Sequence, residues 1–168
     1  MFRRTFFNYA FFALANIFYL SNTASVSASD KAKEKDMPNN INHAIDNFYD
    51  ALNLMFKGEG GAMIAAWSHA DDITYMGPSG EYLVGWTDIR KEWEKQTSAR
   101  LGGTVKPIQT QIIEGRDLAV LNCIESGENV INGVAETVKL RSSTVFRKEE
   151  AAWKVVGHQT DLLSYLSK

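Results

Sequence analysis

The sequence of 168 residues contains one cysteine, Cys123, and three prolines. A single cysteine excludes a disulfide within the chain, so the stability of the fold must come from its hydrophobic core. The chain also lacks a surplus of either charge, with 18 basic and 20 acidic residues and a formal net charge of −2. No basic stripe is visible, which argues against nucleic acid as a partner.

Histidine is scarce too, with His43, His69 and His158 as the three examples. His69 lies close to Asp71 and Asp72 in sequence, but this group lacks the i, i+4 spacing of a helical zinc pair. No glycine-rich phosphate loop follows a predicted strand. We therefore predict no metal and no cofactor.

The N-terminal residues 1–28 have the pattern of a secretory signal peptide. Arg3 and Arg4 precede a largely apolar run over residues 5–20, and small residues before position 29 form a cleavage site. The alternative is a membrane anchor, but the run is shorter than the about 20 residues that a spanning helix needs. The two arginines also resemble a twin-arginine signal, and both export routes stay open. We predict a periplasmic or secreted protein, with no membrane association after cleavage.

Residues 29–39 are rich in lysine and acidic side chains and predict a solvated linker. Apolar residues then recur at helical spacing over residues 41–56, which predicts a first helix with one apolar face. A second helix is predicted from about Gly61 to His69. A third is predicted to begin at Thr87, because threonine is a good N-cap residue.

The sequence next predicts strands. Two short strands, 73–76 and 82–84, flank a turn with proline and glycine, and after Thr104 the apolar pattern changes to a period of two. Four longer strands are expected, over residues 105–113, 118–125, 134–147 and 153–160, with a turn region at 127–133. This order predicts an α+β fold, cone-shaped, with three N-terminal helices packed on the concave face of a strongly curved antiparallel sheet. Such a cone leaves a pocket between sheet and helices.

Several segments together resemble the SnoaL-like branch of the nuclear transport factor 2-like superfamily. They are FYDAL at 48–52, WSHADDITYMGP at 67–78, VGW at 84–86, VFR at 145–147, WKVV at 153–156 and HQTD at 158–161. The resemblance implies that residues 40–168 form a cone domain, usually paired into a homodimer through the open sheet face. Members include isomerases, cyclases, dehydratases and proteins that only bind, so it does not imply one chemistry.

The resemblance allows the catalytic positions of ketosteroid isomerases to be compared with this chain. In those enzymes, the proton-moving carboxylate lies five residues after the second aspartate of an Ala-Asp-Asp segment. Counted from Asp72, that position is Gly77, which cannot act as a base. The tyrosine and protonated acid of the isomerase oxyanion hole fall approximately on Ala51 and Ser143. The comparison therefore argues against the isomerase mechanism.

Three residues are candidates for chemistry. His158 lies on the last predicted strand and, on a face that points into the cone, would act as a general base or orient a ligand. Asp161 would fix its tautomer, and Glu125, at the end of an apolar strand, would supply a carboxylate. The alternative for His158 is a buried histidine satisfied by the backbone. For Asp71 and Asp72 we expect capping and turn formation.

Five further side chains are predicted to line the pocket, two of which have a core position as the alternative. They are Tyr75, Trp86, Thr160, Trp67 and Trp93. For Trp67 and Trp93 the alternative is a position in the hydrophobic core. They predict a small hydrophobic or amphipathic ligand. Two functions stay open, and the missing base at Gly77 favours the first. One is an exported, non-catalytic binding or dimer module, and the other is an isomerase-, cyclase- or dehydratase-type enzyme that uses His158 with a nearby carboxylate.

Overall fold

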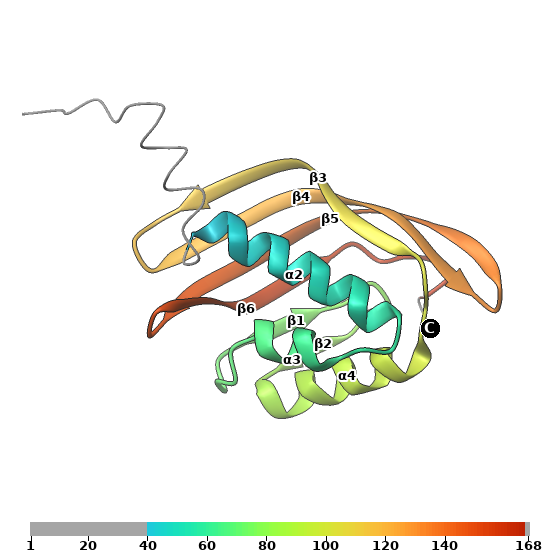
Figure 1. The fold of residues 1–168 in the computed structure, drawn as a ribbon, viewed down its shortest axis with the longest axis horizontal. Coiled ribbons are helices and arrows are strands. Elements are labelled where there is room, and N and C mark those ends of the chain that lie inside the picture. Colours follow the sequence, from blue (N-terminus) through green and yellow to red (C-terminus); the bar gives the residue numbers. More distant parts are fainter. Residues whose placement is uncertain (1–39, 167–168) are drawn as a thin grey trace, which may run out of the picture.

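The computed structural model describes residues 40–166, so the predicted signal peptide (1–28) and linker (29–39) lie outside the described residues. The helices come first and most of the strands follow, which confirms the predicted α+β class (Figure 1). The elements are α2 (Ile41–Phe56), α3 (Gly61–Ala66), β1 (Thr74–Met76), β2 (Tyr82–Val84), α4 (Trp86–Ala99), β3 (Thr104–Glu114), β4 (Leu118–Ile131), β5 (Val134–Glu149) and β6 (Ala152–Thr160).

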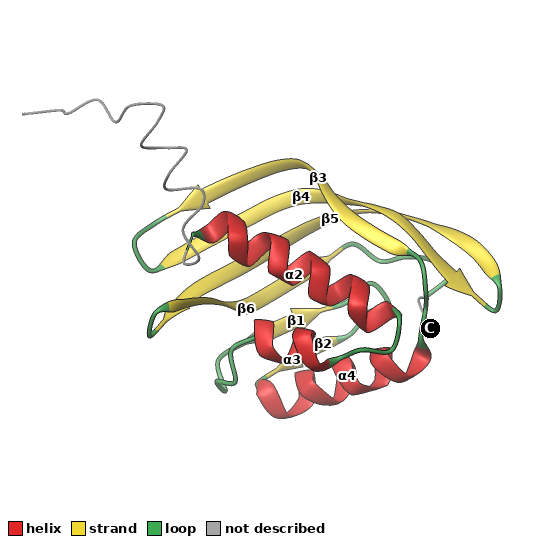
Figure 2. Cartoon of the chain, viewed as in Figure 1, coloured by secondary structure: helices red, strands yellow, loops and turns green. Residues whose placement is uncertain are grey.

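The six strands form one curved, unclosed sheet in the order β2-β1-β6-β5-β4-β3 (Figure 2). Neighbouring strands are antiparallel except β1 and β6, which pair in parallel and which the prediction of an antiparallel sheet did not include. A parallel neighbour requires a long connection, and everything from β2 to β5 lies between these two strands in sequence. The sheet curves around α2, while α3 and α4 lie near β1 and β2 (Figures 1 and 2).

The predicted apolar face of α2 is buried against the sheet. Asn40 is the N-cap residue, and its side chain accepts a hydrogen bond from the Asn42 backbone N–H at 2.8 Å. Ile41, Phe48 and Met55, spaced along the same face, are each at most 1 % exposed. Removing this much apolar surface from water is the main favourable contribution to folding that such a helix makes.

The predicted turn region 127–133 is wrong for most of its length, because β4 continues through it. Gly127 lies inside the strand since β3 passes so close that a Cβ there would lie 1.9 Å from the Thr104 carbonyl oxygen. The turn itself consists of Asn132 and Gly133, with φ angles of 52° and 81°. Positive φ at both central residues is the requirement of a type I′ two-residue hairpin turn.

Two helix boundaries also differ from the prediction. Helix α4 begins at Trp86, and Gly85 rather than Thr87 is its N-cap residue. Gly85 has a φ of 84°, a conformation in which a side chain would be strained. Helix α3 ends earlier than predicted, because Trp67 adopts an extended backbone and bridges to Val155 of β6. Within the described residues, no helix has both the length and the apolar character needed to cross a membrane.

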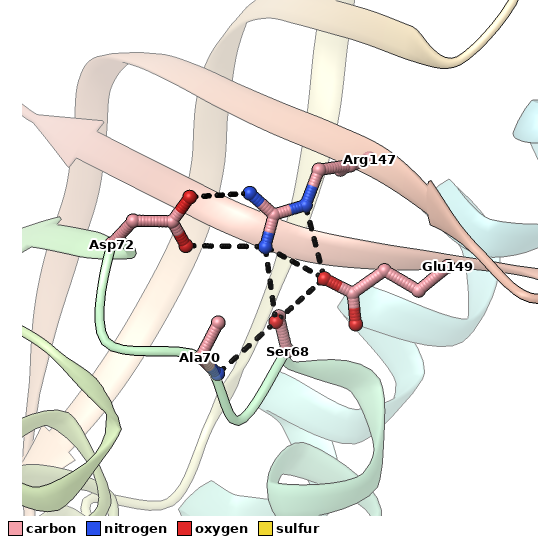
Figure 3. Close-up of polar contacts among 5 residues, drawn as sticks. All are labelled: Ser68, Ala70, Asp72, Arg147 and Glu149. Atoms are coloured by element: carbon pink, nitrogen blue, oxygen red, sulfur yellow. Dashed lines mark hydrogen bonds and ion pairs between the residues drawn. The ribbon is translucent and has the colours of Figure 1, made fainter.

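A network of hydrogen bonds and ion pairs joins the segment before β1 to β5 (Figure 3). The Arg147 guanidinium donates to both Asp72 oxygens at 2.7 and 3.1 Å and to Glu149 Oε1 at 2.7 Å. Ser68 Oγ donates to Glu149 Oε1 at 2.7 Å and accepts from the Ala70 backbone N–H at 3.3 Å. Hydrogen bonding from Arg147 lowers the pKa of Asp72 below its usual value. Burial works to raise the pKa of Glu149, but hydrogen bonds from Ser68 and Arg147 lower it.

Arg147→Met removes the cation of this network. Because the folded-state pKa values of Asp72 and Glu149 lie below their unfolded values of 3.8 and 4.5, their stabilisation is present above those values. It is lost as the pH falls through the lower folded-state values. We therefore expect Arg147→Met to lower the free energy of unfolding at neutral pH, with a smaller effect at about pH 3. Urea denaturation at both pH values measures the difference.

The matched control is Arg90→Met, which removes the same side chain from an exposed pair with Glu94 on α4. Exposed pairs of this kind contribute at most about 1 kcal/mol, so we expect little change. A difference between wild type and Arg147→Met that stays the same at both pH values would contradict the assigned role of the network.

Candidate functional site

A cavity of about 240 Å³ lies between the inner face of the sheet, helices α2 and α4, and the residues that follow β6. Its wall is mainly apolar and includes the aromatic rings of Phe48, Phe56, Tyr75 and Trp93. The polar side chains in the wall come from the sheet, from α4 and from the turn after β1. They include Glu125, Asn129, His158 and Thr160 on the sheet, Glu92, Lys95 and Gln96 on α4, and Ser79 in the turn.

A β-bulge turns His158 toward the cavity. In β6, Trp153 and Val155 face the core, so uninterrupted alternation would place His158 on the opposite face of the sheet. The pairing with β5 shifts at this point, because Val155 and Gly157 pair with successive residues of β5 and Val156 is the extra residue. His158 therefore has an inward side chain and is only 7 % exposed.

The bulge places His158 beside Glu125. The Nε2 atom of His158 lies 3.7 Å from Oε1 of Glu125, which is 4 % exposed on the inner face of β4. The structure thus brings together two of the predicted candidate residues, one from each of two strands that do not pair with each other. A carboxylate reaches the imidazole inside a largely apolar wall.

The hydrogen bonds and burial of His158 set its protonation state. Its Nδ1 atom lies 2.9 Å from the Thr144 hydroxyl on β5, and its Nε2 faces Glu125. Burial lowers the pKa of His158 below its usual 6.5, while the charge of Glu125 acts in the opposite direction. The imidazole is therefore neutral at neutral pH, and a neutral imidazole can accept a proton.

Tyr49 is a member of this site that the sequence analysis missed. Its hydroxyl donates a hydrogen bond to Glu125 Oε1 at 3.0 Å and lies 3.3 Å from Cys123 Sγ. Burial, with the charge of Glu125, raises the pKa of Tyr49 above its usual value, so the phenol stays protonated. A tyrosine on the buried face of a helix needs a partner for its hydroxyl, and that was the available signal. The resemblance had pointed instead to Ala51.

The space beside Gly77 is filled by the side chain of Tyr75. A Cβ at Gly77 would lie 2.5 Å from the Tyr75 hydroxyl, so the hydroxyl occupies the space beside this glycine. Gln96 Nε2 donates to the Tyr75 oxygen at 3.1 Å and to Glu92 Oε1 at 3.0 Å. Burial raises the pKa of Tyr75 above its usual value. A protonated phenol therefore lies next to the position of the missing carboxylate.

Asp161, the third candidate, is not brought to His158. Its carboxylate pairs with the Arg141 guanidinium, with Nε–Oδ2 and Nη2–Oδ1 distances of 2.9 Å each. Hydrogen bonds from Arg141 lower the pKa of Asp161 below its usual value. Within the described residues, the two imidazole nitrogens of His158 face Thr144 and Glu125 instead.

Of the five predicted lining residues, three line the cavity and two lie elsewhere. Tyr75, Trp93 and Thr160 line the cavity. Trp67 is 1 % exposed and packs on Trp93 with ring centroids 5.3 Å apart, away from the cavity wall, as the core alternative states. Trp86 stacks on the His69 ring at 4.0 Å and does not line the cavity. Among residues 40–166, no group of three His, Cys, Asp or Glu side chains is arranged to hold a metal ion.

Solved structures from bacteria share this fold. A candidate dehydratase of the NTF2-like family from Streptomyces avermitilis superposes with a TM-score of 0.64 at 15 % identity, covering 73 % of this chain and 94 % of that one. A candidate calcium/calmodulin-dependent protein kinase type II association domain from Thiobacillus denitrificans gives 0.59 at 22 %, with the same coverage. A candidate ketosteroid isomerase from Shewanella frigidimarina gives 0.58 at 14 %, covering 71 % and 92 %. At these identities the similarity establishes the fold and not the activity.

Sequence comparison gives the family. No curated protein matches the sequence. The profile of the SnoaL-like domain matches residues 41–162, which includes every helix and strand described above. This match confirms the resemblance seen in the sequence, and the chain belongs to the SnoaL-like domain family.

Proposed function

We propose that the protein binds a small, mainly apolar molecule in the cavity, and that His158, assisted by Glu125, transfers a proton to or from that molecule. The observation that carries this proposal is the buried pair itself, with its 3.7 Å separation in the wall of the cavity. A histidine whose pKa is shifted by burial inside a pocket, as that of His158 is, is typical of acid–base sites.

Each polar group of the site has a role in this proposal. The neutral imidazole of His158 accepts the proton, and the Thr144 hydroxyl, 2.9 Å from Nδ1, orients the ring. Glu125 stabilises the imidazolium that forms, and Tyr49 fixes the orientation of that carboxylate. Because Gln96 donates to the Tyr75 oxygen, the phenolic proton of Tyr75 is available to an oxygen atom of the bound molecule.

A single group that transfers protons would suit reactions that move a proton at carbon. Isomerisation and dehydration both move a proton at carbon, and similar structures include a candidate dehydratase and a candidate ketosteroid isomerase. The base would differ from that of the isomerases, because Gly77 carries no carboxylate. We also propose that the protein works after export, on the basis of the signal-peptide pattern in residues 1–28.

A second candidate function is a non-catalytic dimer or binding module, which the absence of a side chain at position 77 favours. Strands β3 to β6 have an outer face that no described helix covers (Figures 1 and 2). One similar structure is a candidate association domain, which fits assembly through such a face. We propose that two chains pair through this outer face, and this pairing is compatible with either function.

Nitrobenzisoxazole tests the proton-transfer proposal, because its ring opens to an absorbing product when a base removes its C–H proton. We expect the wild-type protein to catalyse this reaction and His158→Gln to lose about a hundredfold in kcat/KM. Since the base works only when deprotonated and burial lowers the pKa of His158, the rate should rise with pH and reach half its plateau below pH 6.5. Absorbance kinetics across the pH range measure both effects.

The matched control is Asp161→Asn, which changes a carboxylate that pairs with Arg141 outside the cavity wall, so its rate should equal that of wild type. Thermal melting establishes whether His158→Gln is folded. If it is unfolded, the pH midpoint of the wild-type rate still decides the question. Equal rates in wild type and folded His158→Gln would show that His158 is not the base.

The dimer proposal is tested on Ile124, which lies on the outer face because its neighbours Cys123 and Glu125 face inward. We expect the wild-type protein to sediment with the mass of two chains and Ile124→Glu to shift toward one chain, since a buried charge without a partner is costly. Val84→Glu, an exposed position on β2, is the control and should leave the mass unchanged. A wild-type protein with the mass of one chain would overturn the pairing.

A further inference from the structure

The cavity wall contains more acidic than basic side chains. Four lining residues are charged or titrate near neutral pH, and they are Glu92, Lys95, Glu125 and His158. Because burial keeps His158 neutral at neutral pH, two carboxylates face one ammonium group. Among the charged side chains of the described wall, carboxyl groups therefore outnumber ammonium groups by two to one.

Lys95 does not balance Glu125, because other carboxylates already engage it. Its ammonium group lies 3.0 Å from Glu92 Oε2 and 3.7 Å from Glu81 Oε1. Its side chain is 56 % exposed, whereas the side chain of Glu125 is 6 % exposed. Glu125 thus remains a buried carboxylate that faces a neutral imidazole and a phenol but no described cation.

Aromatic rings lie beside His158 in the same cavity wall. The Phe48 ring centroid lies 5.2 Å from that of His158, and the Tyr75 ring stacks on His158 at 6.1 Å. Trp93 packs edge-on against Tyr75 at 4.6 Å, and all three rings line the cavity. Ring faces attract cations through their negative quadrupole, most strongly where water is excluded.

We propose that the molecule bound in the cavity is an organic cation, with an ammonium group near Glu125 and a mainly apolar body against the aromatic wall. The carboxylate and the rings compensate the ammonium group for the water it loses, whereas a carboxylate ligand would meet uncompensated negative charge. This inference rests on the proposed function only for binding in the cavity, and it does not require proton transfer.

The inference is tested with three probes of similar size that differ in charge: phenethylammonium, phenethyl alcohol and hydrocinnamate. Isothermal titration calorimetry at neutral pH gives the Kd of each for the wild-type protein. We expect phenethylammonium to bind about tenfold more tightly than the alcohol, and hydrocinnamate to bind most weakly. This comparison needs no variant and so does not depend on the folding of one.

Glu125→Gln then identifies the carboxylate responsible. We expect this change to bring the Kd values of phenethylammonium and phenethyl alcohol within about twofold of each other, while the alcohol keeps its affinity. The matched control is Glu94→Gln, which removes an exposed carboxylate of α4 that pairs with Arg90 outside the cavity wall. It should leave the preference for the cation unchanged.

The outcomes separate this inference from the proposed function. If phenethyl alcohol or hydrocinnamate binds as tightly as phenethylammonium, the cation inference is overturned and binding in the cavity stands. If none of the three probes binds, both are overturned. A preference for the cation that persists in Glu125→Gln, with that variant folded, would overturn the role of Glu125.

Discussion

The burial of Glu125 beside His158 is the interaction on which the rest of the site depends. Moving a carboxylate out of water costs several kcal/mol unless hydrogen bonds or charges compensate it. Here one oxygen accepts a hydrogen bond from the Tyr49 hydroxyl, and an imidazole that burial keeps neutral lies 3.7 Å away. This arrangement is poor for stability in comparison with apolar packing, and a polar pair of this kind in a cavity wall is a reason to infer function.

The sheet creates the pair through one local irregularity. Without the bulge at Val156, the alternation of β6 would leave His158 on the outer face, and Glu125 would have no imidazole beside it. The same curvature that encloses the cavity brings α2 over the sheet, so that Tyr49 reaches Glu125. Tyr75, whose ring centroid lies 6.1 Å from that of His158, occupies the space beside Gly77. The absence of a side chain at Gly77 thus makes room for the Tyr75 hydroxyl in the site.

The local pattern of apolar residues predicts most helices and strands. It does not predict which strands pair or which distant residues come into contact. The apolar spacing of residues 41–56 and the period of two after Thr104 predict the helix and the four long strands that the structure has, although β4 continues past its predicted end at Glu125 to Ile131. The pattern predicts a turn at Gly127, because the close approach of β3 that requires a glycine there is not visible in sequence. His158 and Glu125 were each recognised as candidates, but their contact depends on a bulge and on strand order. The Asp161–Arg141 ion pair also could not be predicted, because it depends on the pairing of β5 with β6.

The most direct test is a nitrogen-15 NMR titration of the His158 imidazole in wild type and in Glu125→Gln. The account requires a pKa below 6.5 in wild type, because burial outweighs the charge of Glu125. It also requires a further decrease in Glu125→Gln, since the variant keeps the burial and removes the charge that opposes it. A His158 that titrates at or above 6.5, or that does not respond to the loss of the carboxylate, would show that the two groups are not a buried, interacting pair.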